Sequence, residues 1–243
     1  MEIYSRIYNL SKKGKKQLAV LVDPDKHQVS DFPVLAKKLS SYPIDYFLIG
    51  GSLLSRDLLE ECLKAFKEAT SIPLIIFPGG VMQINPHADA ILFLSLISGR
   101  NPELLIGKHV ESVPYILKAN LEAISTGYIL VNGGNMTTAQ YISNTLPIPA
   151  DKPDIAAITA KAGELLGMKT IYLDAGSGAH NSISLEMIKQ VRAIINIPLI
   201  VGGGIRTVKD AQDKLNAGAD VLVIGTAFEQ DLSKLDEIMA AFQ

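Results

Sequence analysis

Two glycine-rich segments in the last fifth of the chain have the composition of a phosphate-binding site. Segment 201–206 reads VGGGIR, and segment 224–227 reads IGTA. Glycine lacks a Cβ atom, so backbone N–H groups can approach an anion closely, and a following helix directs its positive end at that anion. These segments predict a site for a phosphorylated ligand. The alternative is that the glycines only form tight turns.

A carboxylate lies in a third such segment, YLDAGSGA at 172–179. Asp174 follows a short apolar run, where a carboxylate can act as a general base or accept a hydrogen bond from a substrate hydroxyl. The glycines and the serine after it offer further donors. An aspartate in a turn can also serve only as a capping residue.

A possible metal site is formed by the segment DPDK at 23–26 and the segment GGS at 50–52. A carboxylate near a hydroxyl suits Mg²⁺, which takes few protein oxygens and completes its shell with water and phosphate oxygens. Asp-Pro-Asp is equally a good turn sequence, so the segment alone leaves both interpretations open.

Other reactive residue types fit no known catalytic spacing. The four histidines lack the H-x-x-x-H and H-E-x-x-H patterns of zinc sites, and the glycines match neither the dinucleotide nor the P-loop fingerprint. The lone cysteine, Cys62, falls on the apolar face of an expected helix, which indicates a core position. Lysines at 12–16 are expected to be solvated. The histidines are His27, His87, His109 and His180.

The elements that must position these segments are eight short apolar runs separated by mostly helical patterns. Nearly continuous apolar strands are typical of parallel sheets with both faces buried. Eight such units in this length favour a (β/α)8 barrel, whose active site forms at the carboxyl ends of the strands. The expected strands are 18–22, 46–49, 74–77, 90–94, 127–131, 170–173, 199–201 and 221–224, and the clearest expected helices are 56–70, 154–166 and 184–194.

The third unit is expected to be irregular. Only 12 residues, PGGVMQINPHAD, separate Phe77 from Ala90, and they include two prolines and two glycines. A full crossover helix with both its loops does not fit there. The predicted fold is therefore a modified (β/α)8 barrel with an irregular third helical unit.

Composition narrows the class of protein further. The chain has 243 residues, a net charge of −2, 48% hydrophobic residues and one cysteine. A near-neutral balance argues against nucleic-acid binding, and no apolar run is long enough to cross a membrane. A single cysteine and a polar, basic start without a signal peptide favour the cytoplasm. No linker divides the sequence, which predicts one domain over residues 1–243.

Together, DPDK, IGGS, YLDAGSGA, VGGGIRT and IGTAF occur in an order that resembles the geranylgeranylglyceryl phosphate synthase family, over about residues 17–229. SLISGRNPELLIGKH and GYILVNGG are similar to its second, larger group. The resemblance implies a TIM barrel that lacks a regular helix after the third strand. It also implies a Mg²⁺-dependent prenyltransferase that joins sn-glycerol 1-phosphate to a prenyl diphosphate, with geranylgeranyl diphosphate expected. Members often form dimers or hexamers, so a homo-oligomer is expected.

The resemblance also assigns residues. Asp23 and Ser52 would be the metal ligands, and Asp174 and Tyr172 the catalytic pair that holds the attacking hydroxyl. The family usually has Glu where this chain has Asp174, and Asp is one methylene shorter, so the base could need a bridging water or a shifted substrate. Glycerol phosphate would contact Tyr172, Leu173, Asp174, Ala175, Gly176, Ser177 and Gly178, and its phosphate would contact Gly203, Gly204, Gly225 and Thr226.

Three functions other than prenyl transfer are also compatible with the sequence. A phosphosugar isomerase or aldolase would use the same phosphate site, although no strand-end lysine indicates a Schiff base. A flavin-dependent oxidoreductase would place its cofactor phosphate there, and a non-catalytic phosphometabolite-binding barrel would need no base. An apolar groove for a prenyl tail distinguishes the prenyltransferase, and the candidates for it are Leu53, Leu54, Phe77, Leu94 and Leu96.

Overall fold

Eight parallel strands close into a barrel in the computed structural model, which describes residues 2–225 and 233–242. Each strand pairs with the next along the chain, and the last pairs with the first. This confirms the predicted barrel. The strands are β1 (Gln17–Val22), β2 (Tyr46–Ile49), β3 (Leu74–Ile76), β4 (Ala90–Leu96), β5 (Glu122–Leu130), β6 (Thr170–Asp174), β7 (Leu199–Gly202) and β8 (Val221–Ile224).

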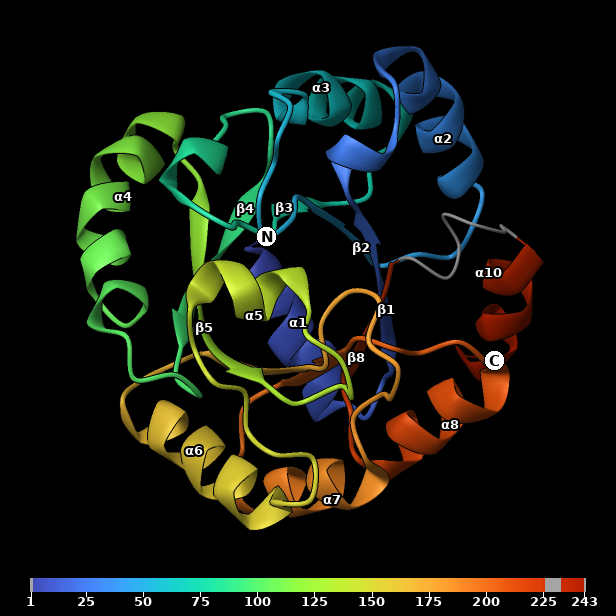
Figure 1. Cartoon of the computed structure of the whole chain (residues 1–243). Helices are drawn as coiled ribbons and strands as arrows, with labels where there is room; N and C mark the ends of the chain where they lie inside the picture. Colours follow the sequence, from blue (N-terminus) through green and yellow to red (C-terminus); the bar gives the residue numbers. More distant parts are fainter. Residues whose placement is uncertain (1, 226–232, 243) are drawn as a thin grey trace.

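Helices form a ring around the barrel, and two more lie over its axis in the view of Figure 1. The α-helices are α1 (Ile3–Lys12), α2 (Phe32–Leu39), α3 (Leu59–Ala69), α4 (Gly107–Ala119), α5 (Thr138–Ser143), α6 (Pro153–Leu165), α7 (Leu185–Ile194), α8 (Val208–Ala217) and α10 (Ser233–Met239). The 3₁₀-helices are η1 (Pro24–Lys26), η2 (Val29–Asp31), η3 (Val81–Gln83), η4 (Pro102–Leu104) and η5 (Ala240–Phe242). None of the helices in these two stretches is both long and apolar enough to cross a membrane.

Two apolar layers make up the core. In β1, Leu18, Val20 and Val22 point outward and pack in the layer between strands and helices. Ala19 belongs to the layer inside the barrel, with Leu21 packed against it. Because both faces of each strand are buried, the strands are nearly continuous apolar runs in the sequence.

The third unit is irregular, as expected. The short helix η3 stands where a full helix follows most other strands. The Gln83 side chain fastens this segment: its Nε2 donates to the Gly51 carbonyl, and its Oε1 accepts from the Gly79 N–H, both at 3.0 Å. A Cβ atom at Gly79 would lie 2.2 Å from the Ser52 carbonyl oxygen, so this close approach requires glycine. A loop that is hydrogen-bonded to the segment after β2 replaces the missing helix.

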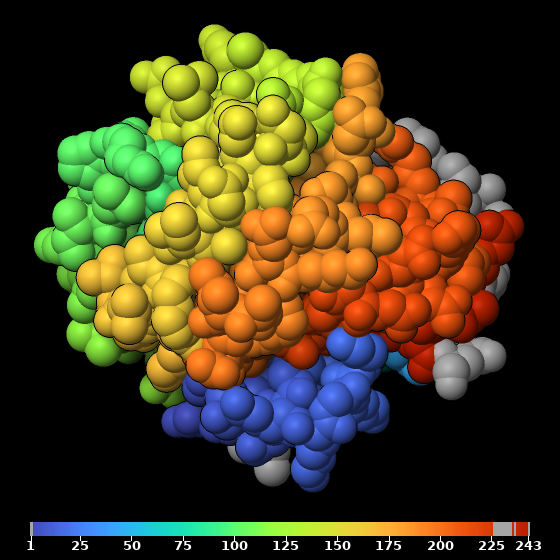
Figure 2. All heavy atoms as spheres, turned by 90° about the horizontal axis from the view of Figure 1, so that it is seen from below, coloured from blue at the N-terminus to red at the C-terminus, as the bar shows by residue number. Residues whose placement is uncertain are grey.

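The amino-terminal helix α1, which sequence analysis did not predict, closes the end of the barrel at which the strands begin. Ile3 and Ile7 are buried among the residues of the inner layer. The Glu122 carboxylate accepts hydrogen bonds from the N–H groups of Ile3 and Tyr4 at the start of the helix. Figure 2 shows this dark-blue helix at one end of the molecule and the yellow-green segment that contains α5 at the opposite end.

Candidate active site

A cavity of about 410 Å³ opens at the carboxyl ends of the barrel strands. This is the end at which barrel enzymes place their active sites. Nine of the residues assigned from the sequence line it together, from β1, β2, β6, β7, β8 and the loops that follow them. They are Asp23, Ser52, Tyr172, Asp174, Ser177, Gly178, Gly203, Gly204 and Gly225.

Three of the assigned residues do not line the cavity. Leu173 and Ala175 alternate with Tyr172 and Asp174 along the chain, so they are buried in the outer layer against the helices. Gly176 lies behind the cavity wall, where its N–H donates to the Asp174 Oδ1 atom at 2.7 Å. The structure gives these three a supporting position. The remaining assigned residue, Thr226, lies outside the described residues.

Asp174 is a buried carboxylate with both oxygens fixed. Its Oδ2 accepts a hydrogen bond of 2.6 Å from the Tyr128 hydroxyl, and its Oδ1 accepts from the Gly176 N–H. Burial raises the pKa of Asp174 above its ordinary value, and these two hydrogen bonds oppose that rise. A raised pKa makes this carboxylate a stronger base than a solvated aspartate. The environment therefore suits a general base.

Three aromatic rings pack against one another in the cavity wall, and one of them, Tyr128, hydrogen-bonds to this carboxylate. Tyr172 is stacked with Phe77 at 5.6 Å between centroids, and Tyr128 meets both rings edge to face at 5.4 and 5.9 Å. Burial raises the pKa of both tyrosines, so their hydroxyls stay neutral and able to donate. The three rings form an apolar part of the cavity wall next to Asp174 and the tyrosine hydroxyls, which can bind a substrate hydroxyl.

The glycine turn after β7 packs directly behind Asp174. Gly203 and Gly204 have φ values of +82° and +72°, a left-handed conformation that favours glycine. A Cβ at Gly203 would lie 2.7 Å from the Asp174 Oδ1 atom and from the Ala175 backbone nitrogen. The turn thus brings backbone close to the carboxylate, as a phosphate cradle next to a hydroxyl-binding group requires.

A guanidinium holds the two loops of this half of the cavity together. Arg206 donates to the carbonyls of Ala179 and His180, the second at 3.1 Å. Those carbonyls belong to the loop after β6, whereas Arg206 follows the glycine turn after β7. Arg206 also lines the cavity, so it adds positive charge to the side where an anion is expected.

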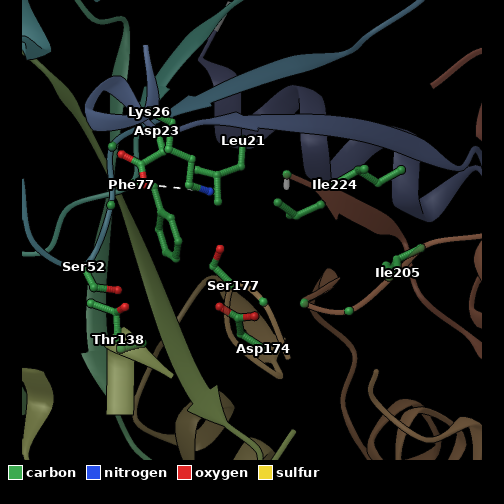
Figure 3. A pocket seen from close by; sticks show the side chains of 18 of the residues that line it. Leu21, Asp23, Lys26, Ser52, Phe77, Thr138, Asp174, Ser177, Ile205 and Ile224 are labelled. Carbon is green, nitrogen blue, oxygen red and sulfur yellow. Dashed lines mark ion pairs between the residues drawn. The ribbon is translucent and has the colours of Figure 1, made fainter. Parts of the chain in front are cut away.

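The other half of the cavity carries the proposed metal ligands. Asp23 follows β1 directly and caps η1, and its Oδ1 accepts from the Asp25 N–H at 3.1 Å. Its Oδ2 lies 4.0 Å from the Lys26 ammonium, the ion pair drawn dashed in Figure 3. Figure 3 also shows Asp23 and Lys26 across the cavity from Asp174 and Ser177. The two halves therefore face each other over one space.

Asp25, by contrast, has a structural role. Its carboxylate accepts hydrogen bonds from the Ser55 hydroxyl at 2.8 Å and from the backbone N–H groups of Ser55 and Arg56. Burial acts to raise the pKa of Asp25, but these bonds outweigh it and lower the pKa. They also keep residues 55 and 56 in the loop, so α3 begins at Leu59 and not at the expected residue 56.

The donor set fits Mg²⁺ bound together with a substrate. The described residues hold no group of three or more His, Cys, Asp or Glu side chains that could bind a metal by themselves. Magnesium usually takes one or two carboxylates and completes its shell with water and substrate phosphate oxygens. A Cβ at Gly51 would lie 3.5 Å from the Asp23 carboxylate oxygens, so the backbone just before Ser52 passes near that carboxylate. One carboxylate and one hydroxyl meet this requirement.

Several residues of the cavity wall were missed by sequence analysis. Lys26 belongs to the segment DPDK but was given no role of its own, yet it lines the cavity. Tyr128 was hidden within an apolar run, and Thr138 and Ala139 come from α5, a helix that had not been predicted. In the sequence, Lys26 was visible as the last residue of DPDK and Tyr128 as a tyrosine within an expected strand, and these positions were the signals that could have indicated a place in the cavity wall. Among the described residues, those that line the cavity without having been given an individual role from the sequence are Leu21, Asp25, Lys26, Gly50, Gly51, Tyr128, Thr138, Ala139, Ile205, Arg206, Val223 and Ile224.

The fold and this cavity define a class: (β/α)8-barrel proteins with a carboxylate and a glycine-rich anion cradle at the carboxyl ends of the strands. Residues 12–242 match the model of the PcrB family, and the chain belongs to that family. The fold, the order of motifs and the family match agree over nearly the whole chain.

Two similar proteins carry the same name. Geranylgeranylglyceryl phosphate synthase of Chitinophaga pinensis is 50% identical over 240 residues, which cover 99% of this chain and 95% of that protein. The protein of the same name from Nitrosopumilus maritimus is 42% identical, covering 96% and 93%. These similarities confirm the resemblance inferred from the motifs.

A solved structure extends the comparison to a ligand. It is the crystal structure of (S)-3-O-geranylgeranylglyceryl phosphate synthase from Thermoplasma acidophilum in complex with substrate sn-glycerol-1-phosphate. Its TM-score to this chain is 0.91 at 29% identity, and the alignment covers 100% of this chain and 97% of that one.

Proposed function

We propose that this protein is a geranylgeranylglyceryl phosphate synthase, which transfers a prenyl group from its diphosphate to the C3 hydroxyl of sn-glycerol 1-phosphate. The observation that carries the proposal is the meeting of two complementary half-sites in one cavity. The half with Asp174 and the glycine turns suits a phosphorylated alcohol. The half with Asp23 and Lys26 suits a diphosphate. The identity of 50% to a synthase of that name supports the same reaction.

In the first half-site, glycerol phosphate is held at both ends. Its phosphate rests on the backbone of Gly203, Gly204 and Gly225, and its hydroxyls meet Asp174 and Tyr172. Fixing both ends orients the C3 hydroxyl toward the second substrate, which lowers the entropic cost of the reaction. The Asp174 carboxylate accepts the proton that this oxygen loses as it forms the ether bond.

In the second half-site, the prenyl diphosphate is held by its charge. The Lys26 ammonium neutralises part of the diphosphate, and Asp23 and Ser52 would hold a Mg²⁺ ion next to it. When bound, Mg²⁺ neutralises charge on the departing diphosphate. The allylic carbon gains positive character as its bond to the diphosphate oxygen breaks, and the glycerol oxygen attacks it. Diphosphate leaves with the electron pair of the broken bond.

The start of the tail path follows from the positions of the candidate apolar residues. Leu53 and Phe77 line the cavity, so we assign them to the first part of the prenyl tail. Leu94 and Leu96 pack in the inner layer of the barrel, and Leu54 packs against the outer layer. Of these three, Leu96 is buried and Leu54 and Leu94 are half-buried, and none of them is among the described residues that line the cavity, so we leave them out of the first part of the groove.

We further propose a homo-oligomer in the cytoplasm. Exposed apolar side chains on α4 support self-association: Val110 is 65% exposed and Leu117 is 73% exposed. Large exposed apolar patches commonly mark interfaces between proteins. Light scattering after gel filtration tests this, and a mass in solution of 26.2 kDa, that of one chain, would contradict it.

Product formation tests the proposed reaction. The protein is incubated with labelled sn-glycerol 1-phosphate, Mg²⁺ and a series of prenyl diphosphates of increasing length. An organic-extractable ether phosphate is expected, with the geranylgeranyl donor giving the highest kcat/KM. The sn-glycerol 3-phosphate enantiomer is the control and should react much more slowly. If no donor of any length yields product, the proposed function is wrong.

A further inference from the structure

The hydroxyl of Tyr128 contacts the expected base directly, although neither the phosphate cradle nor the metal site uses it. Its oxygen lies 2.6 Å from the Asp174 Oδ2 atom. Both residues line the cavity, and their side chains are buried, with exposed fractions of 7% and 5%. The Tyr128 ring packs against Phe77 and Tyr172, so the hydroxyl cannot easily turn away.

The length of the carboxylate makes this contact significant. The resemblance implies a glutamate at the position of Asp174, and aspartate is one methylene shorter. In this chain the shorter carboxylate is held back at the end of β6 by the Gly176 N–H on one oxygen and by Tyr128 on the other. The Tyr128 hydroxyl therefore extends the reach of the carboxylate within the same cavity wall. A hydroxyl can accept one hydrogen bond while it donates another.

We propose that Tyr128 is a second catalytic residue, which bridges the shortened carboxylate of Asp174 and the C3 hydroxyl of glycerol phosphate. The inference rests on the proposed function. As the glycerol oxygen bonds to the allylic carbon, its proton moves to the Tyr128 oxygen. At the same time the phenolic proton moves to Asp174. Tyrosine ends neutral, Asp174 ends protonated, and the carbon–oxygen electron pair leaves with the diphosphate.

The electrostatics of the pair suit such a relay. Burial and the neighbouring Asp174 charge raise the pKa of Tyr128 well above its usual value, so a free tyrosinate does not accumulate. Burial also raises the pKa of Asp174, so this carboxylate accepts a proton more readily than a solvated one. The net result is therefore that Asp174 gains one proton, while Tyr128 is neutral before and after the step.

The test combines removal of the hydroxyl with lengthening of the carboxylate. Tyr128→Phe deletes the bridge and leaves the space of one oxygen atom next to Asp174. We expect kcat to fall by about 10²-fold, the lower range for loss of a general acid–base group, with the glycerol-phosphate KM changed by less than about threefold. Adding Asp174→Glu to this variant should restore at least about a tenth of the wild-type kcat, because the longer carboxylate reaches into the vacated space.

A matched control is available in the same barrel. Tyr46 is also buried, and its hydroxyl donates to the Gln17 Oε1 atom at 2.7 Å, near the α1 end of the barrel. Tyr46→Phe removes an equivalent buried hydrogen bond and should lower the melting temperature without lowering kcat. A similar loss of kcat in both variants would show that only stability is affected and would overturn the proposal.

The outcomes separate this inference from the proposed function. If wild-type protein gives no ether product, the proposed function fails. If wild type is active and Tyr128→Phe keeps its kcat, or the double variant is no better than Tyr128→Phe, the bridge is wrong. Asp174→Glu alone provides a second test if Tyr128→Phe does not fold. The added methylene would collide with the Tyr128 hydroxyl, so kcat should fall at least tenfold, and an unchanged kcat would overturn the proposal.

Discussion

Gly225 offers the cleanest test of the proposed phosphate site, because an added Cβ there meets the described residues only at ordinary van der Waals distances. An added Cβ would lie 3.5 Å from the Leu21 Cβ and Cδ2 atoms, an ordinary van der Waals distance, and Gly225 is not among the glycines with positive φ. At Gly204, by contrast, φ is +72° and the Cβ would lie 3.0 Å from the Ser182 nitrogen. We therefore choose Gly225→Asp, which adds negative charge to the cradle with little strain.

The expected magnitude follows from Coulomb's law. A carboxylate about 4 Å from one phosphate charge, at an effective dielectric constant of about 20, is repelled by about 4 kcal/mol. Gly225 is half-buried, so solvent screening reduces this to about 2–4 kcal/mol. This energy corresponds to a rise of about 30- to 1,000-fold in the KM for glycerol phosphate, since about 1.4 kcal/mol changes an equilibrium tenfold. The prenyl diphosphate KM should change far less.

The assay measures initial rates with sn-glycerol 1-phosphate varied at saturating prenyl diphosphate, and calorimetry measures its binding directly. Gly225→Asn is the matched control, since it has the same shape without the charge, and its KM should stay within about threefold of wild type. Higher salt should narrow the difference between the two variants. Equal KM values for the Asp and Asn variants would refute the phosphate position.

Three further predictions concern other parts of the molecule. Asp23→Asn keeps an oxygen that can accept from the Asp25 N–H but removes the negative charge. Activity should therefore fall at least about 100-fold, and added Mg²⁺ should restore only part of it. Full activity of EDTA-treated wild type without metal would contradict this. Burial, aided by the nearby Asp23 charge, raises the pKa of Cys62 to about 12, so a thiol reagent at pH 8 should label the unfolded but not the native protein, and rapid native labelling would contradict it. Ile7→Ala should lower the free energy of unfolding by about 2–4 kcal/mol without lowering kcat, since it opens a cavity at the end of the barrel that α1 closes. Denaturant titration measures this change. An unchanged midpoint would show that α1 does not stabilise the barrel.

The barrel could be predicted from the sequence because every strand is buried on both faces. Prediction failed where the barrel wall is polar. The expected fifth strand began at residue 127, whereas β5 begins at Glu122. Glu122 caps α1, and Thr126 accepts a hydrogen bond of 2.9 Å from Thr170 inside the barrel. Such polar residues break an apolar run, and only their partners from distant segments make them compatible with a strand.

The amino-terminal helix was missed for a similar reason. Its apolar residues Ile3 and Ile7 are spaced for one helix face, but the start of the chain was described only as polar and basic, and only the lysines at 12–16 were assigned, as solvated residues. Helix α1 is held by its contacts with the open end of the barrel, and this end exists only after the chain has folded. The sequence gives no local signal for that contact.

The site was predictable to the extent that it lies at strand ends. A parallel barrel gathers the residues after each strand at one rim, so Asp23, Asp174 and the glycine turns could be grouped without coordinates. Tyr128 could not, because it lies within a strand and its importance depends on a hydrogen bond to the neighbouring strand. Side-chain direction likewise decided that Leu173 and Ala175 point away from the cavity.

The most direct test of the central claim follows the attacking oxygen. sn-Glycerol 1-phosphate labelled with ¹⁸O at its C3 hydroxyl is incubated with the protein, geranylgeranyl diphosphate and Mg²⁺, and the product and the released diphosphate are analysed by mass spectrometry. Attack by this hydroxyl on the allylic carbon predicts that the label is retained in the ether product and absent from the diphosphate. An unlabelled product, label in the diphosphate, or no ether product would contradict prenyl transfer to the C3 hydroxyl.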